Sequence, residues 1–279
     1  MTPVTSSPLA GSPSALVSWV ERIGRGTRQR IADFGSTARF LGETARSFGE
    51  VRTWAPLFMD QARRLGVDSL PIGLFIAAFT GIVLALLASY SFTGAVPLYF
   101  IGTLVGKTVI LELAPVLTGL ALAGRVGANI AAEIGTMRVT EQIDALETLA
   151  YDPLAYLVVP RVLAGTLMFP VIVAAAMVMG VFCGWAASGL LLNVSSAEFL
   201  KGLRLFFQVF DVRYGLVKSA SFGLAVTLIG ARRGLNAQGG AVGVGSACTS
   251  AVVYSAVMIL VLDAFWAVTW LLGREATAP

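Results

Sequence analysis

The 279-residue chain contains no histidine, and this absence excludes several kinds of active site. A Ser-His-Asp triad, a Cys-His pair and every histidine-ligated metal site need an imidazole side chain. The only two cysteines, Cys183 and Cys248, lie inside apolar runs, so we interpret them as small buried side chains and expect no disulfide framework. The sequence therefore excludes hydrolases that depend on a catalytic histidine and metal sites that depend on a histidine ligand.

Charged side chains are also scarce. They make up 13% of the residues, against about 25% in a typical soluble domain, while 56% of the residues are hydrophobic. The mean hydropathy of +0.80 is more than a single soluble core can bury, so the chain needs a lipid solvent. The net charge of +4 is carried mainly outside the apolar runs, which favours a membrane protein over one that binds nucleic acid.

The first 66 residues precede the long apolar runs and divide into two parts. Residues 1–20 begin with a stretch rich in Ser, Pro and Thr that lacks the features of a signal peptide, and we expect a disordered tail. Residues 21–66 are Arg-rich, with apolar residues such as Phe34, Leu41 and Phe48 at helical spacing. We interpret them as cytoplasmic amphipathic helices in the membrane interface; a soluble helix packed on a partner is the alternative.

Residues 67–273 hold five stretches that are apolar and long enough to cross a bilayer, which takes about 20 residues. We expect spans at 70–90, 111–137, 162–191, 214–231 and 246–272. Between the first two we expect a turn and a short helix that folds back near the surface from about Leu98, and after the third a mixed loop at 195–214. Lys218 lies close enough to the rim of its span to reach the interface. The predicted fold is an all-α integral membrane protein, with an N-terminal interfacial helix followed by five transmembrane helices.

The distribution of basic residues predicts the orientation. With the N-terminus inside, thirteen Lys and Arg residues lie on the inner side and six on the outer side. The positive-inside rule therefore favours a cytoplasmic N-terminus and a periplasmic tail at residues 274–279.

The second and third spans carry small residues four apart, a pattern that lets helix backbones approach closely in lipid. The residues that we expect at such contacts are Gly124, Ala128, Ala132, Gly127, Ala131, Gly135, Gly180 and Gly184.

Besides Lys218 at a rim, four charged residues lie inside the predicted spans, namely Glu112, Arg125, Glu133 and Asp263. Because a charge at the bilayer centre costs about 2.5–3.5 kcal/mol, we expect all four to face protein or water. Arg125 and Glu133 are about 80° apart around one helix, so they can pair through a neighbour or across a dimer. An ion-pair network that fixes helix packing is our favoured interpretation, and a lipid headgroup contact at Arg125 is the alternative.

A short acidic helix is predicted between the second and third spans. Its apolar residues 143, 146 and 149 fall on one face and its acidic residues 141, 144 and 147 on another. We expect Thr140 to cap its N-terminus, and Asp152 and Pro153 to start the next helix. Anionic lipid would repel these carboxylates, so the pattern indicates docking to a protein partner, with a solvated loop helix as the alternative.

Several sequence blocks together resemble the MlaE (YrbE) permease family over residues 54–272. The blocks are Leu111-Glu112-Leu113-Ala114-Pro115-Val116-Leu117, residues 123–128, residues 132–146, Asp152-Pro153, Val159-Pro160-Arg161, residues 239–245 and Asp263. A match of this length and order is far more specific than a short motif.

The resemblance implies a non-catalytic permease subunit of an ABC transporter that moves lipids, phospholipids foremost, between the inner and outer membranes of bacteria. It implies a homodimer, a pair of cytoplasmic ATPase subunits that hold the ATP and Mg²⁺, a periplasmic ring of MCE-domain proteins and, in some systems, a small STAS-domain protein. It also assigns the cytoplasmic coupling helix to Glu141, Gln142, Ile143, Asp144, Ala145, Leu146, Glu147 and Leu149.

Two other functions are weaker on the sequence. A secondary transporter or channel that works alone is the alternative, but the five spans show no inverted repeat. A membrane enzyme built on Glu112 and Asp263 lacks a recognisable nucleophile and base. The glycine-rich residues 234–245 lack the Gly-Lys-Ser/Thr ending of a phosphate-binding loop, so we expect a tight turn there and no ATP hydrolysis by this chain.

Overall fold

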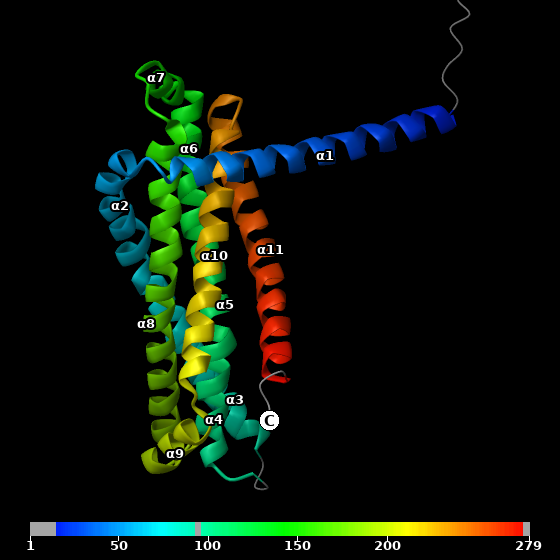
Figure 1. Cartoon of the computed structure of the whole chain (residues 1–279). Helices are drawn as coiled ribbons and strands as arrows, with labels where there is room; N and C mark the ends of the chain where they lie inside the picture. Colours follow the sequence, from blue (N-terminus) through cyan, green and yellow to red (C-terminus); the bar gives the residue numbers. More distant parts are fainter. Residues whose placement is uncertain (1–14, 93–95, 276–279) are drawn as a thin grey trace, which may run out of the picture. The chain divides into compact units, whose positions relative to one another are not determined.

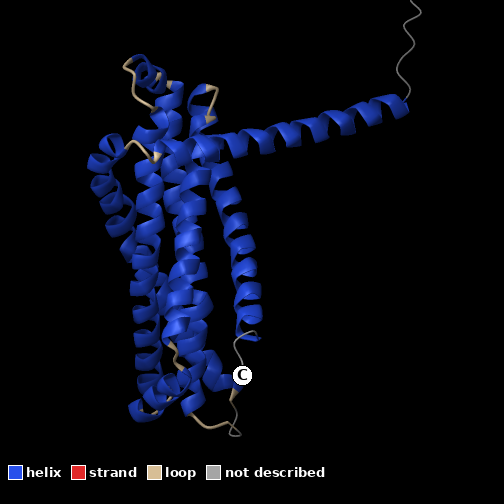
Figure 2. Ribbon diagram, in the orientation of Figure 1, coloured by secondary structure: helices blue, strands red, loops and turns tan. Residues whose placement is uncertain are grey.

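The computed structural model describes residues 15–92 and 96–275, and within these ranges it contains helices and no strand (Figure 2). Five helical segments are long and apolar enough to cross a bilayer: Val51–Ser91, Tyr99–Val139, Leu154–Leu191, Val209–Leu235 and Gly240–Trp270. The predicted all-α membrane fold with five spans is therefore confirmed.

Helix α1 (Ala15–Ser47) makes up the described part of a first compact unit, residues 1–46. It exposes the apolar side chains of Phe34 and Leu41 among polar residues, as an amphipathic helix requires. Residues 15–20, which we predicted to belong to the tail, are helical, and residues 1–14 lie outside the described residues. The interfacial position of α1 stays a prediction.

The second compact unit, residues 47–279, is built around the close packing of α3 (Leu70–Ser91) on α8 (Val159–Leu191). A Cβ atom on Gly81 would fall 2.0 Å from the carbonyl oxygen of Gly180, and one on Gly184 would fall 3.1 Å from that of Gly81. Glycine alone lets two backbones come this close. Helix α2 (Val51–Gly66) also packs on α8, and the 3-10 turn η1 (Val67–Ser69) joins it to α3.

The second span is one uninterrupted helical segment of five parts. They are α4 (Tyr99–Thr108), the π turn η2 (Val109–Leu113), α5 (Ala114–Leu122), the π turn η3 (Ala123–Gly127) and α6 (Ala128–Val139). The predicted fold-back helix and the predicted start at 111 are therefore wrong. Because Pro115 has no N–H and crowds the carbonyl of Leu111, it would disturb a regular helix, and the widened turn η2 accommodates it.

The two ends of the bundle carry the short helices. At one end, α7 (Gln142–Thr148) and the π turn η4 (Leu154–Val158) connect the second span to α8 (Figure 1). At the other end, α9 (Ser196–Phe206) packs on α4 where we predicted a mixed loop. Glycine allows this packing, because a Cβ on Gly202 would lie 1.7 Å from the carbonyl oxygen of Tyr99. We call these ends the α7 end and the α9 end.

The last two spans are α10 (Val209–Leu235) and α11 (Gly240–Glu275). The glycine-rich segment that we predicted as a turn is mostly helical, since only residues 236–239 lie outside the two helices. Gly239 and Gly240 have φ angles of 84° and 69°, which side chains with a Cβ rarely adopt. The reversal of the chain is therefore confined to this short connection.

Candidate functional site

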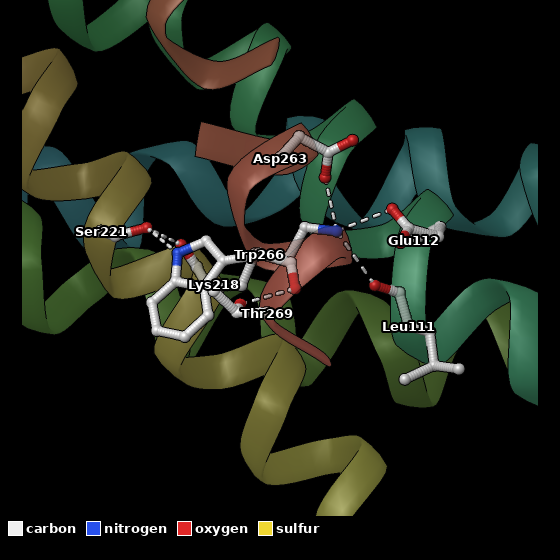
Figure 3. Close-up of polar contacts among 7 residues, drawn as sticks. All are labelled: Leu111, Glu112, Lys218, Ser221, Asp263, Trp266 and Thr269. Carbon is white, nitrogen blue, oxygen red and sulfur yellow. Dashed lines mark hydrogen bonds and ion pairs between the residues drawn. The ribbon is translucent and has the colours of Figure 1, made fainter. Parts of the chain in front are cut away.

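A fully buried lysine joins three spans inside the bundle. The Nζ atom of Lys218, on α10, lies 2.7 Å from a carboxylate oxygen of Glu112 on η2 and forms a second ion pair with Asp263 on α11 (Figure 3). It also donates a hydrogen bond of 3.4 Å to the carbonyl oxygen of Leu111. That carbonyl is four residues before Pro115, so the proline cannot provide its usual helical donor. We call Lys218, Glu112 and Asp263 the buried lysine cluster.

The buried lysine cluster carries a net charge, and its two carboxylates are partly exposed. One ammonium group faces two carboxylates, so the cluster carries one excess negative charge when all three groups are ionised. The side chain of Lys218 has no exposed surface, whereas that of Glu112 is 43% exposed and that of Asp263 is 25% exposed. Because exposed carboxylates are costly against lipid chains, this face of the bundle must meet water, polar groups or another protein.

Aromatic side chains close one side of the cluster. Lys218 Nζ lies 5.5 Å from the ring centroid of Tyr214, one turn earlier on α10. Trp266 of α11 packs edge-on against Tyr214 and donates a hydrogen bond of 3.0 Å from its indole nitrogen to Ser221 (Figure 3). The Lys218 side chain thus has an aromatic face on one side and carboxylates on the other.

The other two predicted intramembrane charges lie nearer the α7 end and do not pair with each other. Glu133 is 2.9 Å from Arg161, whose guanidinium also donates to the carbonyl of Leu157 at 2.7 Å. Arg125 donates to the backbone carbonyl of Asp68. Within the described protomer Arg125 and Glu133 therefore do not pair through a shared neighbour, because their bonded groups belong to different elements, and pairing across a dimer stays a prediction.

Sequence reasoning missed two residues that organise these charges. We placed Lys218 at the rim of a span beginning at 214, but α10 begins at Val209 and buries it. We placed Arg161 just before a span beginning at 162, but the helical segment begins at Leu154 and carries it two turns inward, opposite Glu133. The available signal was a charge imbalance, since the predicted spans held three acidic residues and, apart from Lys218 at a rim, one basic residue.

The acidic helix α7 stands at the end of the second span. Ile143 is buried and Leu146 is half-buried, while Asp144 forms a 2.6 Å ion pair with Arg138. The remaining predicted coupling residues are all exposed: Glu141, Gln142, Ala145, Glu147 and Leu149.

Four residues show how the observed ends of these helices compare with the expected capping. The hydroxyl of Thr140 donates to the carbonyl of Thr136, so Thr140 ends α6 and does not cap α7. Glu141 takes the capping position with a φ of 60°. Leu149 is exposed because α7 ends at Thr148. Asp152 accepts a hydrogen bond of 2.9 Å from the backbone N–H of Leu154, as expected for the cap of the next helix.

The two small-residue stripes of the second span differ in what covers them. A Cβ on Gly127 would lie 3.4 Å from Val226, and one on Gly135 would lie 3.3 Å from Ala237, while Ala131 is fully buried. This stripe packs inside the protomer. The stripe of Gly124, Ala128 and Ala132 is only half-buried, and a Cβ on Gly124 would meet no described atom within 4 Å. Gly124 therefore makes none of the helix contacts that we predicted for it within the described protomer.

Known proteins resemble the chain over most of its length. The profile of the permease MlaE family matches residues 58–269. A Rickettsia typhi protein named "Probable ABC transporter permease protein" is 39% identical over 246 residues, which are 88% of this chain and 95% of that protein. The Haemophilus influenzae intermembrane phospholipid transport system permease protein MlaE is 30% identical over 89% of this chain and 95% of its own length. The chloroplast protein TRIGALACTOSYLDIACYLGLYCEROL 1 of Arabidopsis thaliana is 33% identical over 74% of this chain and 59% of its own length.

Proposed function

The chain belongs to the MlaE permease family, and we propose that it is the membrane subunit of an ATP-driven transporter that carries phospholipid between an inner and an outer membrane. It is a multi-pass membrane permease of the ABC type. The phospholipid named for the Haemophilus relative supports the substrate. In this proposal a separate ATPase subunit binds ATP and Mg²⁺, and this chain supplies the path.

The observation that carries the proposal is the exposed acidic helix α7, held firmly between two spans. Ile143 anchors it in the bundle, and Arg138 ties Asp144 to the end of α6. The other side is fixed by Asp152, which accepts hydrogen bonds from Leu154 and from the hydroxyl of Ser47 at 2.6 Å. Because α7 is attached at both sides, a partner that moves it also moves α6 and α8, as coupling to an ATPase requires.

The surface at the buried lysine cluster supports a second copy of the chain as partner. The cluster exposes carboxylates that lipid chains cannot solvate, and the stripe through Gly124 leaves room for a close helix approach. We propose that two copies meet at this face and that the lipid moves along their seam.

We place the transporter in the inner membrane of a bacterium, with a cytoplasmic N-terminus and a periplasmic C-terminus. The excess of basic residues on the N-terminal side supports this orientation. The α7 end then meets the cytoplasmic ATPase dimer, and the α9 end faces a periplasmic ring of MCE-domain proteins. A STAS-domain protein is a further partner in systems that encode one.

Charge reversal on α7 tests the proposal. We expect Glu141→Lys, Asp144→Lys and Glu147→Lys together to abolish co-purification of the ATPase and to lower lipid-coupled ATP turnover at least tenfold. The thermal unfolding of the chain should change little, because these side chains are at the surface and the Arg138–Asp144 pair that is lost is well exposed and worth about 0–1 kcal/mol. Glu198→Lys, at an exposed acid on α9, is the matched control.

Three outcomes would contradict parts of this proposal. Retained ATPase binding in the triple variant would remove the docking role of α7. Labelling of a cysteine placed at position 147 from the periplasmic side would reverse the orientation. Lipid movement in vesicles that contain this chain alone would favour a stand-alone transporter.

A further inference from the structure

Two adjoining cavities open between α2, α6 and the start of α8, away from the buried lysine cluster. The larger has a volume of about 620 Å³ and the smaller about 270 Å³, and both are lined by Gln61, Arg64 and Glu133. We call the two together the α2–α6 pocket. The pocket is distinct from the buried lysine cluster, because neither cavity is lined by residues of α10 or α11, although Ala132 of the half-buried stripe borders the larger cavity.

The charged groups of this pocket are balanced in sign. Asp60, Arg64 and Arg161 line the larger cavity, Asp68 and Arg125 line the smaller one, and Glu133 lines both. Three cationic and three anionic side chains suit a ligand that carries both charges, since a purely anionic ligand would also meet three carboxylates.

One of these charged residues, Arg161, has a hydrogen-bond donor without a partner among the described residues. The side chain of Arg161 is 6% exposed, and both of its terminal nitrogens have partners in Glu133 and Leu157. Its Nε atom, however, is buried and has no hydrogen-bond partner among the described residues. An unpaired buried donor is costly, and a ligand oxygen would satisfy it once a shift of the Arg161 side chain exposes the atom to the cavity.

The charged lining of the pocket lies near the α7 end of the bundle. Glu133 is six residues from the end of α6 at Val139, and Arg161 is seven residues from Leu154, which places both about 10 Å below the α7 end of their helices. We assign this level to the lipid headgroups of the leaflet at that end, where the polar layer of a bilayer is about 5–8 Å thick. Apolar side chains, including Leu57 and Leu157, line the same cavity beside the charges and provide a surface for acyl chains.

We propose that the α2–α6 pocket binds the phosphate-bearing headgroup of a zwitterionic phospholipid in the leaflet at the α7 end. The phosphate binds the guanidinium of Arg64 and, after a small shift of that side chain, Arg161 Nε, and the amine of the headgroup lies near the carboxylates of Asp60 and Glu133. This inference rests on the proposed lipid transport, and it adds a lipid site outside the seam between two copies, at the level where coupling to α7 begins.

Native mass spectrometry of the complete complex, without ATP, tests this site. The protein is released from nanodiscs of phosphatidylethanolamine and phosphatidylglycerol, and retained lipids are counted. Thr136→Trp fills the larger cavity from an exposed position, and Arg64→Gln removes one of its cations. We expect each to lower retained phosphatidylethanolamine at least fivefold, and Arg64→Lys to restore it. Thr269→Trp, at an exposed position on α11, is the matched control.

Several results would overturn the inference. Unchanged phosphatidylethanolamine in both pocket variants would show that the lipid binds elsewhere, provided that thermal unfolding matches the wild type. Equal loss in Thr269→Trp would show a general effect of a bulky residue. Displacement of the retained lipid by millimolar inorganic phosphate, with phosphate bound in its place, would make this a site for free phosphate. Lipid retention is measured without ATP, so it tests the pocket even if the chain does not take part in ATP-driven transport. Conversely, if the pocket binds no lipid, the proposed transport function is not contradicted.

Discussion

The buried lysine cluster and the Arg161–Glu133 pair solve the same problem, an ionic group inside a membrane bundle, in different ways. In the cluster, one cation with no exposed surface holds carboxylates from two other spans. In the pair, a buried arginine meets one carboxylate that is 38% exposed, and its Nε atom has no hydrogen-bond partner among the described residues. The first arrangement crosslinks three helices, whereas the second joins two and leaves one donor unpaired. The comparison separates an ionic group that holds spans together from one that, in our proposal, borders a lipid site.

The largest effect on stability is expected from removing the cation of the buried lysine cluster. Lys218→Met leaves two carboxylates near one another without a cation, and breaking a buried pair in this way costs about 3–5 kcal/mol. We expect a large fall in the midpoint of thermal unfolding in detergent and poor recovery from membranes. Lys201→Met, at an exposed lysine on α9, should have no such effect. A Lys218→Met protein as stable as the wild type would mean that the cluster does not hold the spans together.

Replacing all three charged residues of the buried lysine cluster tests whether the cluster is needed only for stability or also for lipid transfer. Lys218→Met combined with Glu112→Gln and Asp263→Asn should recover most of the lost stability, because replacing a complete buried ionic group is often neutral. The measurement is thermal unfolding together with ATP-driven lipid transfer. If stability and transfer both recover, the cluster is structural. If stability recovers and transfer stays low, the exposed carboxylates also act on the path of the lipid.

The Arg161–Glu133 pair should respond more weakly. Arg161→Met leaves Glu133 unpaired, but this carboxylate is partly exposed and can take up water, so we expect a loss of about 1–3 kcal/mol. Arg64→Met is the surface control, because its ion pair with Asp60 is well exposed and worth about 0–1 kcal/mol. A loss at Arg161 equal to that at Lys218 would remove the contrast between the two regions.

The sequence predicted the class of fold because hydropathy and length constrain it strongly. In a bilayer every backbone group must be bonded within the protein, so five long apolar stretches without strand patterns leave helices as the only solution. The sequence also predicted the acidic helix between the second and third spans and the cap at Asp152, which are local features.

The starts of the spans and the partners of the charges were harder to predict. The second span was predicted to begin at 111, yet α4 and the π turn η2 carry the helix back to Tyr99, and Gly102 and Gly202 bring α4 and α9 together in a contact with no local signature. The misplaced starts of the third and fourth spans concealed the roles of two basic residues, Arg161 and Lys218. Pairing depends on which faces of distant helices meet, and spacing along one helix does not contain that information.

The smallest effect is expected at the half-buried stripe of Gly124, Ala128 and Ala132. A substitution there distinguishes helix contacts within one protomer from contacts between two protomers. Gly124→Ala adds a methyl group that meets no described atom within 4 Å, and alanine favours a helix over glycine by about 1 kcal/mol. The isolated protomer should therefore be unchanged or slightly more stable. Gly81→Ala is the contrasting variant, since its methyl group would strike the backbone of Gly180 and destabilise the protomer itself. If a second copy packs on the stripe, Gly124→Ala lowers the dimer fraction in mass photometry without lowering protomer stability. A dimer fraction equal to that of the wild type would move the seam to another face, and the exposed carboxylates of Glu112 and Asp263 would then need another polar neighbour.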